Sequence, residues 1–254
     1  MSQKEIQHIP YNQMVPELLS AVLPRPRIVR EGWPRVAGLL ALAGLFGWLS
    51  TRPVLAKLAR PFGWLAKFSL GASFLTAYVY RDPRREPLGN APDYIYAPSD
   101  GTILRIEAVE DEPLFVKGPA YRILITSQPL DVAVLRMPLP GQISYIHRGP
   151  QEPTTVGIKT KDQRRLLLTF RSNPYKRISL PYPLAAKESV DIFGEAGQSL
   201  WVTRRLGVRG FGVALLTTLY LPQARMDILC RSSQHTQAGM TVLGRIKPGG
   251  TSLL

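Results

Sequence analysis

Apolar residues dominate two stretches in the first third of the chain. Val36–Ser50 is a 15-residue run without a charge, and Pro61–Tyr80 is a 20-residue run interrupted only by Lys67. A helix rises about 1.5 Å per residue, so the first run falls short of a hydrocarbon core of about 30 Å. The second run is long enough to span it if Lys67 extends to the interface. Both runs are apolar on all sides, which favours contact with lipid, and we expect a membrane helical hairpin over residues 35–80.

Basic residues flank both runs and also occupy the segment between them. Thr51–Arg60 contains Pro53, which favours a turn, and three cations, whereas residues 25–35 carry four arginines and residues 81–85 carry three. The positive-inside rule then predicts that both termini lie in the cytoplasm. We expect a bacterial-type inner (cytoplasmic) membrane, with the soluble domain facing the cytoplasm. Two buried core helices of a soluble protein are the alternative. The residues expected at the membrane interface are Arg35, Trp48, Arg52, Trp64, Lys67, Arg81, Arg84 and Arg85.

The pattern changes near residue 93 to short runs rich in β-branched and aromatic residues. These runs are bounded by Pro, Gly and Asp, and no long amphipathic helix interrupts them. The pattern predicts a mainly β fold, with an antiparallel β-sandwich or barrel-like domain over residues 81–254. Residues 1–34 are predicted to be a basic N-terminal tail. Examples of the short runs are Tyr94–Tyr96, Thr102–Ile106, Tyr121–Ile125, Arg165–Phe170 and Val213–Tyr220.

The charge balance favours an anionic partner. The chain has 254 residues and a formal net charge of +14, which suits either nucleic acid or an acidic lipid surface. The basic residues are scattered and no zinc-finger or RNA-binding signature accompanies them. With apolar runs present, we expect membrane lipids as partners and no nucleic acid.

Other kinds of functional site find little support in the sequence. Cys230 is the single cysteine, so an internal disulfide is excluded, and no Cys/His cluster predicts a metal site. The histidines are His8, His147 and His235, and nothing in the sequence ties them to a carboxylate, which argues against a Ser/His/Asp site. Gly207–Gly212 lacks the spacing of a phosphate-binding loop.

Four short motifs carry a resemblance to a known family. They are Tyr80–Arg85 (Y-R-D-P-R-R), Ala97–Gly101 (A-P-S-D-G), Asp131–Gly141 (D-V-A-V-L-R-M-P-L-P-G) and Gly239–Lys247 (G-M-T-V-L-G-R-I-K). Together they resemble the short, membrane-attached phosphatidylserine decarboxylases. The family's patterns are roughly F-R-D-P-x-R, S-P-A-D-G, D-V-H-V-N-R-x-P-x-x-G and G-x-I-x-F-G-S. The resemblance covers roughly residues 31–249 and is weak over residues 144–200.

Two chemical groups of that family are replaced here. The family's last Ser cleaves the precursor and becomes a pyruvoyl group, and its position is Gly250 in this chain. The family's His, an acid/base group, is Ala133, and the family's Asn is Leu135. Glycine has no hydroxyl, so we expect no pyruvoyl group. Thr251 would give a ketobutyryl group instead, and Ser252 would leave a three-residue chain. The strand that follows the Ser in the family is also expected to be missing.

The remaining motif residues are expected to serve the fold. The resemblance gives Asp100 the position of the family's catalytic Asp, but its partners are replaced, so we expect a structural role. Asp131 and Arg136 are expected to form a structural ion pair. We therefore expect no catalytic, cofactor-binding or metal-binding residues.

These observations lead to three functional hypotheses. The first is a non-catalytic, phosphatidylserine decarboxylase-like pseudoenzyme that serves as an accessory or structural subunit of a membrane protein complex and can hold a phospholipid. The second is an active phospholipid decarboxylase that uses a non-standard site. The third is a monotopic lipid-binding protein without a fixed partner.

Overall fold

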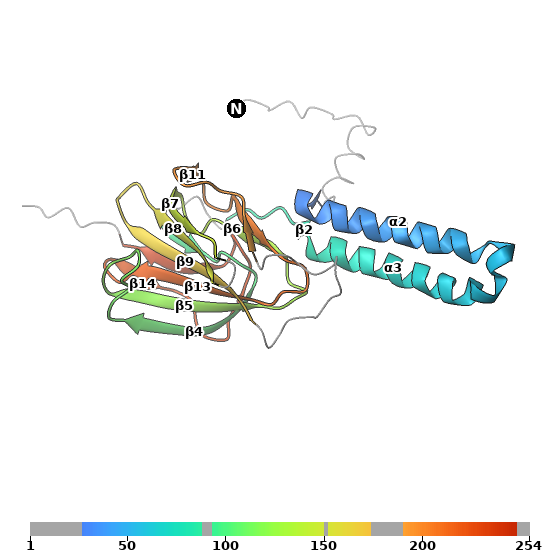
Figure 1. The fold of residues 1–254 in the computed structure, drawn as a ribbon. Helices are drawn as coiled ribbons and strands as arrows, with labels where there is room; N and C mark the ends of the chain where they lie inside the picture. Colours follow the sequence, from blue (N-terminus) through green and yellow to red (C-terminus); the bar gives the residue numbers. More distant parts are fainter. Residues whose placement is uncertain (1–26, 88–92, 150–151, 174–189, 248–254) are drawn as a thin grey trace, which may run out of the picture.

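Two antiparallel helices project from one end of a β domain (Figure 1). The computed structural model describes residues 27–87, 93–149, 152–173 and 190–247. The predictions of a mainly β, antiparallel fold and of an N-terminal hydrophobic helical hairpin are confirmed. The helical elements are η1 (Arg30–Gly32), α2 (Trp33–Ser50), η2 (Pro53–Leu58) and α3 (Ala59–Val79).

Local signals in the sequence set the ends of the hairpin. Pro34 lies in the first turn of α2, and Pro53 opens the short η2 helix that reverses the chain. At the base, β1 (Arg27–Ile28) pairs antiparallel with β2 (Arg81–Asp82). Gly32 allows this closure, because a Cβ at that position would lie 2.6 Å from the Cβ of Tyr80.

The hairpin packs its polar side chains inward and its large apolar side chains outward. Ser69, Ser73 and Thr76 of α3 are buried, and the hydroxyl of Ser73 donates to the carbonyl of Val36 on α2 at 3.3 Å. Small hydroxyl residues at a helix interface are typical of packing within a lipid environment. The exposed apolar side chains include Trp33, Leu40, Leu42, Leu45, Trp48, Trp64, Leu65, Phe68, Leu70, Phe74, Leu75 and Tyr78.

Only Arg30–Ser50, among the described residues, is long and apolar enough to cross a membrane. The second apolar run, which we expected to be long enough to span if Lys67 extends to the interface, forms most of α3. The first helix is longer than its apolar run because helical structure begins with η1 at Arg30. The inward-facing hydroxyls and Lys67 lower the hydropathy of α3.

The strands of the β domain pair antiparallel throughout the described residues. An eight-stranded sheet has the order β11-β7-β8-β9-β13-β5-β4-β15. Its strands are β4 (Gly101–Val109), β5 (Ala120–Ser127), β7 (Gly141–His147), β8 (Thr154–Lys159), β9 (Arg165–Ser172), β11 (Ser199–Leu200), β13 (Leu215–Pro222) and β15 (His235–Thr236).

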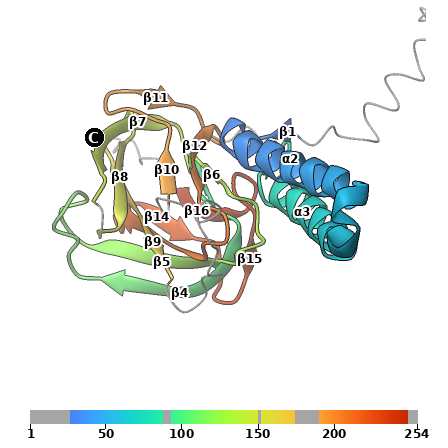
Figure 2. The ribbon, with the colours of Figure 1, turned by 45° about the vertical axis from the view of Figure 1, so that its right-hand side comes forward.

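Two three-stranded sheets complete the domain. One has the order β10 (Val190–Ile192), β12 (Arg205–Arg209), β6 (Val134–Arg136), and the other β14 (Met226–Ile228), β16 (Val242–Ile246), β3 (Tyr94–Tyr96). Figure 2 shows the strands curving around a shared interior, with the hairpin attached at one side.

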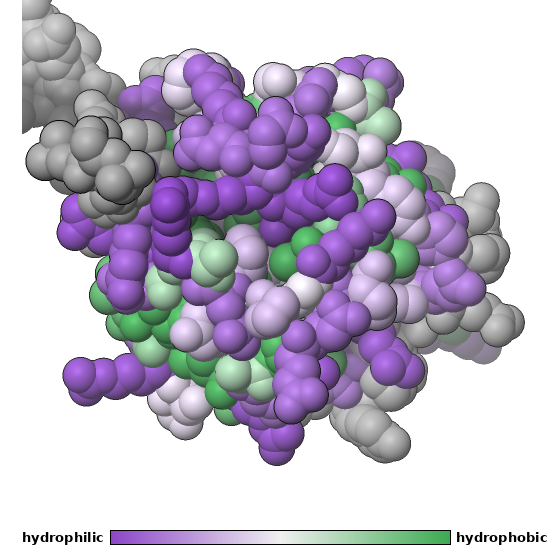
Figure 3. Space-filling view, turned by 90° about the vertical axis from the view of Figure 1, so that its left-hand side faces the viewer, coloured by the Kyte–Doolittle hydropathy of each residue, from purple (hydrophilic) through white to green (hydrophobic). Residues whose placement is uncertain are grey.

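Alternating side chains supply the core of the β domain. Along β13, Leu215, Thr217, Leu219 and Leu221 point inward, while the residues between them are partly exposed. They join buried residues of the neighbouring strands, including Ile123, Ile125, Leu168 and Phe170. The end of the domain opposite the hairpin is covered mainly by hydrophilic side chains (Figure 3). The molecule therefore exposes apolar side chains on the hairpin and mainly polar side chains at the opposite end of the β domain.

Candidate functional site at the junction of hairpin and β domain

Asp100 is held in a buried ion pair. Its carboxylate accepts hydrogen bonds from both terminal nitrogens of Arg85, with Nη2 at 2.7 Å, and from the backbone N–H of Ala238 at 2.7 Å. The side chains of Arg85 and Asp100 are only 7% and 10% exposed. Gly101 follows with φ of +152°, and a Cβ there would lie 2.3 Å from the carbonyl oxygen of Thr126. The carboxylate is thus fully engaged by groups that fix it in place.

Asp82 forms a second buried centre beside the first. Its two carboxylate oxygens accept hydrogen bonds from Arg136, at 2.5 Å, and from Arg205. Arg136 also donates to the carbonyls of Thr203 and Pro83, and burial lowers its pKa despite the charge of Asp82. The expected Asp131–Arg136 pair is therefore wrong. Asp131 instead accepts the backbone N–H of Gln128, because it lies in the turn before β6.

Ala133 lies where the end of α3 meets the β domain. Its N–H donates to the carbonyl of Val79, the last residue of α3, at 3.0 Å, and its carbonyl accepts from the N–H of Arg209 at 2.9 Å. The side chain is fully buried against Val79, Tyr80 and Val208. The position thus belongs to an apolar contact that docks the hairpin.

The buried Arg209 stabilises the loop that leads to this contact. The guanidinium of Arg209 donates to the backbone carbonyls of Val213, Pro129 and Asp131. Burial lowers its pKa to about 10, and the nearby charge of Asp131 opposes that shift. Arg209 fixes the loop that carries Ala133. This role was missed in the sequence analysis, because the hydrogen-bond partners of the guanidinium are backbone carbonyls, which no sequence motif marks.

Hydroxyl groups near Asp100 are occupied with structural hydrogen bonds. Ser99 Oγ lies 3.1 Å from Thr217 Oγ1, Ser127 donates to the carbonyl of Asp100, and Thr236 donates to the carbonyl of Ser99 at 3.2 Å. None of these contacts involves a histidine or another base. These hydrogen bonds hold together the segments around Asp100.

One histidine departs from the sequence prediction. His147 Nε2 lies 2.5 Å from the carboxylate of Glu152, so the expectation that no histidine meets a carboxylate is wrong. Both side chains are well exposed and the loop between β7 and β8 brings them together. His235 is exposed on β15, and His8 lies outside the described residues. Among the described residues no cluster of His, Cys, Asp and Glu could hold a metal ion.

Cys230 is an unreactive core residue. Its side chain is buried, and burial raises the pKa of the thiol to about 11. The thiolate, which is the nucleophile, is therefore scarce at neutral pH.

The C-terminal motif forms β16, but the family's serine position lies beyond the described residues. Gly239–Lys247 runs through β16, with Gly239 at φ of +76° and the N–H of Lys247 donating to the carbonyl of Arg225 at 2.9 Å. Gly250 lies outside the described residues, as do Thr251 and Ser252. Of the three family positions that the sequence singled out, the structure therefore places Asp100 and Ala133.

The predicted interface residues divide into two groups. At the tip of the hairpin, Arg52 stacks over Trp48 at 3.9 Å, and partway along α3 Lys67 lies over Trp64 at 5.3 Å. Arg85 must be withdrawn from this set, because its guanidinium is buried on Asp100.

The other cations of the set surround the base of the hairpin. Arg81 stacks over Tyr78 at 3.6 Å, Arg35 lies over Tyr80 at 5.5 Å, and Arg84 is exposed. Aromatic rings beside cations are characteristic of membrane–water interfaces.

Comparison with known proteins gives a consistent result. The family model described as phosphatidylserine decarboxylase matches residues 73–244 of the chain. This segment runs from the end of α3 to β16 and includes the positions of both buried ion pairs.

Individual relatives cover most of the chain. A phosphatidylserine decarboxylase proenzyme of Symbiobacterium thermophilum is 29% identical over 238 residues, which is 87% of this chain and 97% of that protein. One from Salinibacter ruber is 30% identical over 188 residues, covering 72% of this chain and 81% of the relative. A protein of Methanopyrus kandleri, described as a putative archaetidylserine decarboxylase proenzyme, is 26% identical over 211 residues, covering 79% and 97%.

Proposed function

Since this chain belongs to the phosphatidylserine decarboxylase family, we propose that it is a membrane-anchored pseudoenzyme of that family. Its β domain keeps the family's fold without the self-processing and lipid-decarboxylating chemistry. In this role it serves as an accessory or structural subunit of a membrane protein complex, and the old substrate region can hold a phospholipid.

The single observation that carries the proposal is the environment of Ala133. The family's acid/base histidine is replaced by a methyl group that is fully buried against Val79 and Tyr80 at the docked end of the anchor helix. An alanine cannot take up or release a proton, and its apolar surroundings offer no substitute base.

The residues present also do not fit a pyruvoyl group. Its formation needs a hydroxyl at the position that Gly250 occupies. Asp100, the family position that is retained, is neutralised by Arg85 and has both oxygens engaged. We therefore derive no catalytic step through such a group.

The hairpin supports the membrane part of the proposal. Its inward hydroxyls and outward aromatic and aliphatic side chains suit an apolar surrounding, and cations lie at both of its ends. We place the β domain on the cytoplasmic side of a bacterial-type inner membrane, because the base of the hairpin carries more cations than its turn.

Membrane attachment is expected to resist salt. Apolar insertion does not depend on ionic strength, whereas screening weakens a purely electrostatic attachment. Washing membranes with 1 M salt or alkaline carbonate should leave the chain in the pellet. A double variant, Leu42→Glu with Phe68→Glu, should increase the soluble fraction, while Arg105→Glu on exposed β4 should not. Release of most of the unaltered chain by salt would contradict insertion.

The proposed function is tested by lipid turnover and by assembly size. The purified chain in phosphatidylserine-containing nanodiscs should form no phosphatidylethanolamine above a protein-free control. An active decarboxylase of the same family serves as the positive control. Extraction in mild detergent should give a complex much larger than one chain with its micelle. Clear decarboxylation would favour the active-enzyme alternative, and a uniformly monomeric extract would favour a lipid-binding protein without a fixed partner.

A further inference from the structure

A cavity of about 570 Å³ opens at the end of the β domain that lies opposite the hairpin. It lies beside Pro222, at the end of β13, whereas the start of that strand lies near the docked hairpin. Eight residues of strand extend about 25 Å, so the cavity is remote from the Ala133 contact. Its wall is formed by Val116, Asp162, Gln163, Arg164, Arg165, Pro222, Ala224 and Arg225.

The cavity wall is strongly cationic. It contains three arginines and a single acidic residue, Asp162. None of the ion pairs between described residues involves any of these four side chains. The buried Glu112 lies in the loop that leads to Val116, but its carboxylate already accepts the backbone N–H groups of Leu114, Phe115 and Val116. The wall thus carries a net positive charge, which Asp162 offsets only in part.

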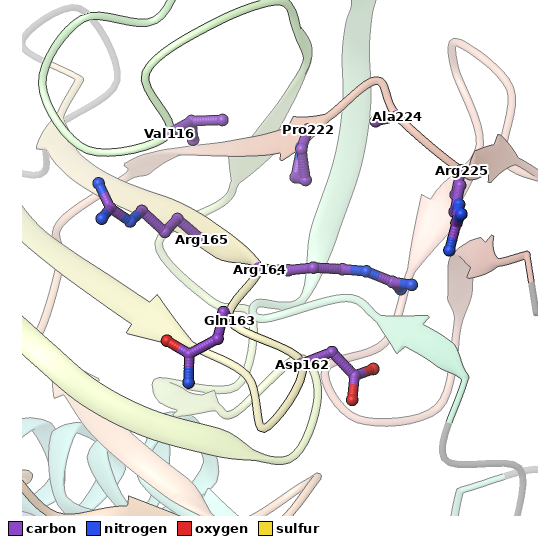
Figure 4. Close-up of a pocket in the computed structure, with 8 residues that line it drawn as sticks. All are labelled: Val116, Asp162, Gln163, Arg164, Arg165, Pro222, Ala224 and Arg225. Carbon is purple, nitrogen blue, oxygen red and sulfur yellow. The ribbon is translucent and has the colours of Figure 1, made fainter. Parts of the chain in front are cut away.

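Two of the three arginines are directed toward each other. Figure 4 shows the side chain of Arg164 extending toward Arg225, while Arg165 points to the opposite side. Arg165 lies over the ring of Phe115 at 6.0 Å, so that contact holds it. Arg164 Nη1 is shielded from solvent and has no hydrogen-bond partner among the described residues. Arg164 as a whole is partly exposed and Arg225 is exposed, so an anion can approach between them and supply an acceptor to these guanidinium groups.

Hydrogen bonds fix the backbone from which both arginine side chains extend. In the turn between β8 and β9, Thr160 N–H donates to the carbonyl of Arg164 at 2.9 Å, and Arg164 N–H donates to Thr160 Oγ1 at 3.1 Å. Arg225 has φ of +58°, and its carbonyl accepts the N–H of Lys247. A fixed backbone lowers the entropic loss when the two side chains close on an anion.

A second cavity of about 340 Å³ adjoins the first, and Gln163 lines both of them. It is lined by Leu200 and Trp201, and Trp201 is 68% exposed although it lies outside the hairpin. A large exposed aromatic ring on a polar surface is characteristic of a binding surface. The two cavities meet at Gln163, with the three arginines lining one and Trp201 lining the other.

We propose that the adjoining cavities bind a phosphomonoester, with its phosphoryl group between Arg164 and Arg225 and its carbon moiety on Trp201. Guanidinium groups suit phosphate oxygens because they donate parallel hydrogen bonds. The ligand comes from the aqueous phase, since the site lies at the end of the β domain away from the hairpin. The proposal is independent of the pseudoenzyme assignment.

The test is titration of the full chain in detergent micelles with phenyl phosphate and methyl phosphate, measured by calorimetry. Both should bind saturably, and phenyl phosphate about fivefold more tightly. Arg164→Gln and Arg225→Gln should each weaken binding at least about tenfold. Trp201→Ala should remove only the preference for the phenyl group. Arg171→Gln, an exposed arginine on the same strand as Arg165, is the matched control and should bind as the unaltered chain does.

Three results would overturn the proposal. The first is absence of saturable binding by the unaltered chain, and the second is equal affinity in the arginine variants and in Arg171→Gln. The third is binding that appears only with phosphatidylcholine vesicles containing phosphatidic acid, since the source would then be a lipid headgroup. A melting temperature within about 2 °C of the unaltered chain shows that a variant is folded. A variant that fails this check is replaced by the Lys substitution at the same position, which keeps the charge and should retain part of the affinity.

Discussion

Asp100→Ala is expected to destabilise the β domain by about 3–5 kcal/mol, because it leaves the guanidinium of Arg85 buried without a counter-ion. The side chains of this pair are 7% and 10% exposed, and the Ala238 N–H would lose its acceptor as well. For a domain of this size the loss corresponds to a fall in melting temperature of roughly 10 °C. Thermal unfolding followed by circular dichroism measures it.

Two further variants test whether the loss of stability in Asp100→Ala comes from breaking a buried ion pair. Asp227→Ala breaks an exposed ion pair, in which the side chain of Lys247 is 55% exposed and that of Asp227 is 47% exposed. This change should lower the stability by less than about 1 kcal/mol. The double variant Arg85→Gln with Asp100→Asn removes both charges and should lose less stability than Asp100→Ala alone. If Asp100→Ala and Asp227→Ala melted at the same temperature, a structural role for Asp100 would be untenable.

Restoring the family's side chains is expected to damage the fold without producing activity. In Ala133→His, an imidazole replaces a methyl group that packs against Val79, Tyr80 and Val208. Overpacking and an unpaired buried polar ring together cost roughly 2–5 kcal/mol. The combined variant Ala133→His with Gly250→Ser should therefore melt well below the unaltered chain and form no phosphatidylethanolamine. Gly250→Ser alone should also form none, since the proton-handling histidine is still missing.

The matched control for this pair is Ala108→His, at an exposed position on β4, which should change stability by less than about 0.5 kcal/mol. Decarboxylation by the combined variant at a rate close to that of an active relative would mean that the surroundings of Ala133 still accommodate catalysis.

The general architecture was predictable because it depends on local patterns. All-round apolar runs predicted the hairpin, and short β-branched runs predicted the antiparallel strands. The inward direction of Ser69, Ser73 and Thr76 was not predictable, because hydropathy along the chain does not reveal which side of a helix faces its partner. Exposure on each side of a helix depends on its partner, which appears only in three dimensions.

The ion pairs were not predictable, because they join residues that are far apart in the sequence. Arg136 pairs with Asp82, 54 positions away, rather than with the nearby Asp131. Arg85 follows a cluster of basic residues that suited a lipid interface, yet it reaches Asp100, 15 positions away. The same limit applies to Arg164 and Arg225, which meet only when the β8–β9 turn and the end of β13 come together.

The most direct test of the central claim is the intact mass of the chain purified from membranes. Self-processing would split the chain and leave a carbonyl-blocked N-terminus on the smaller product. We predict a single species at 28.3 kDa, apart from N-terminal trimming, that does not react with a hydrazide probe. Two chains, with the smaller one reacting with the hydrazide, would contradict the assignment as a pseudoenzyme.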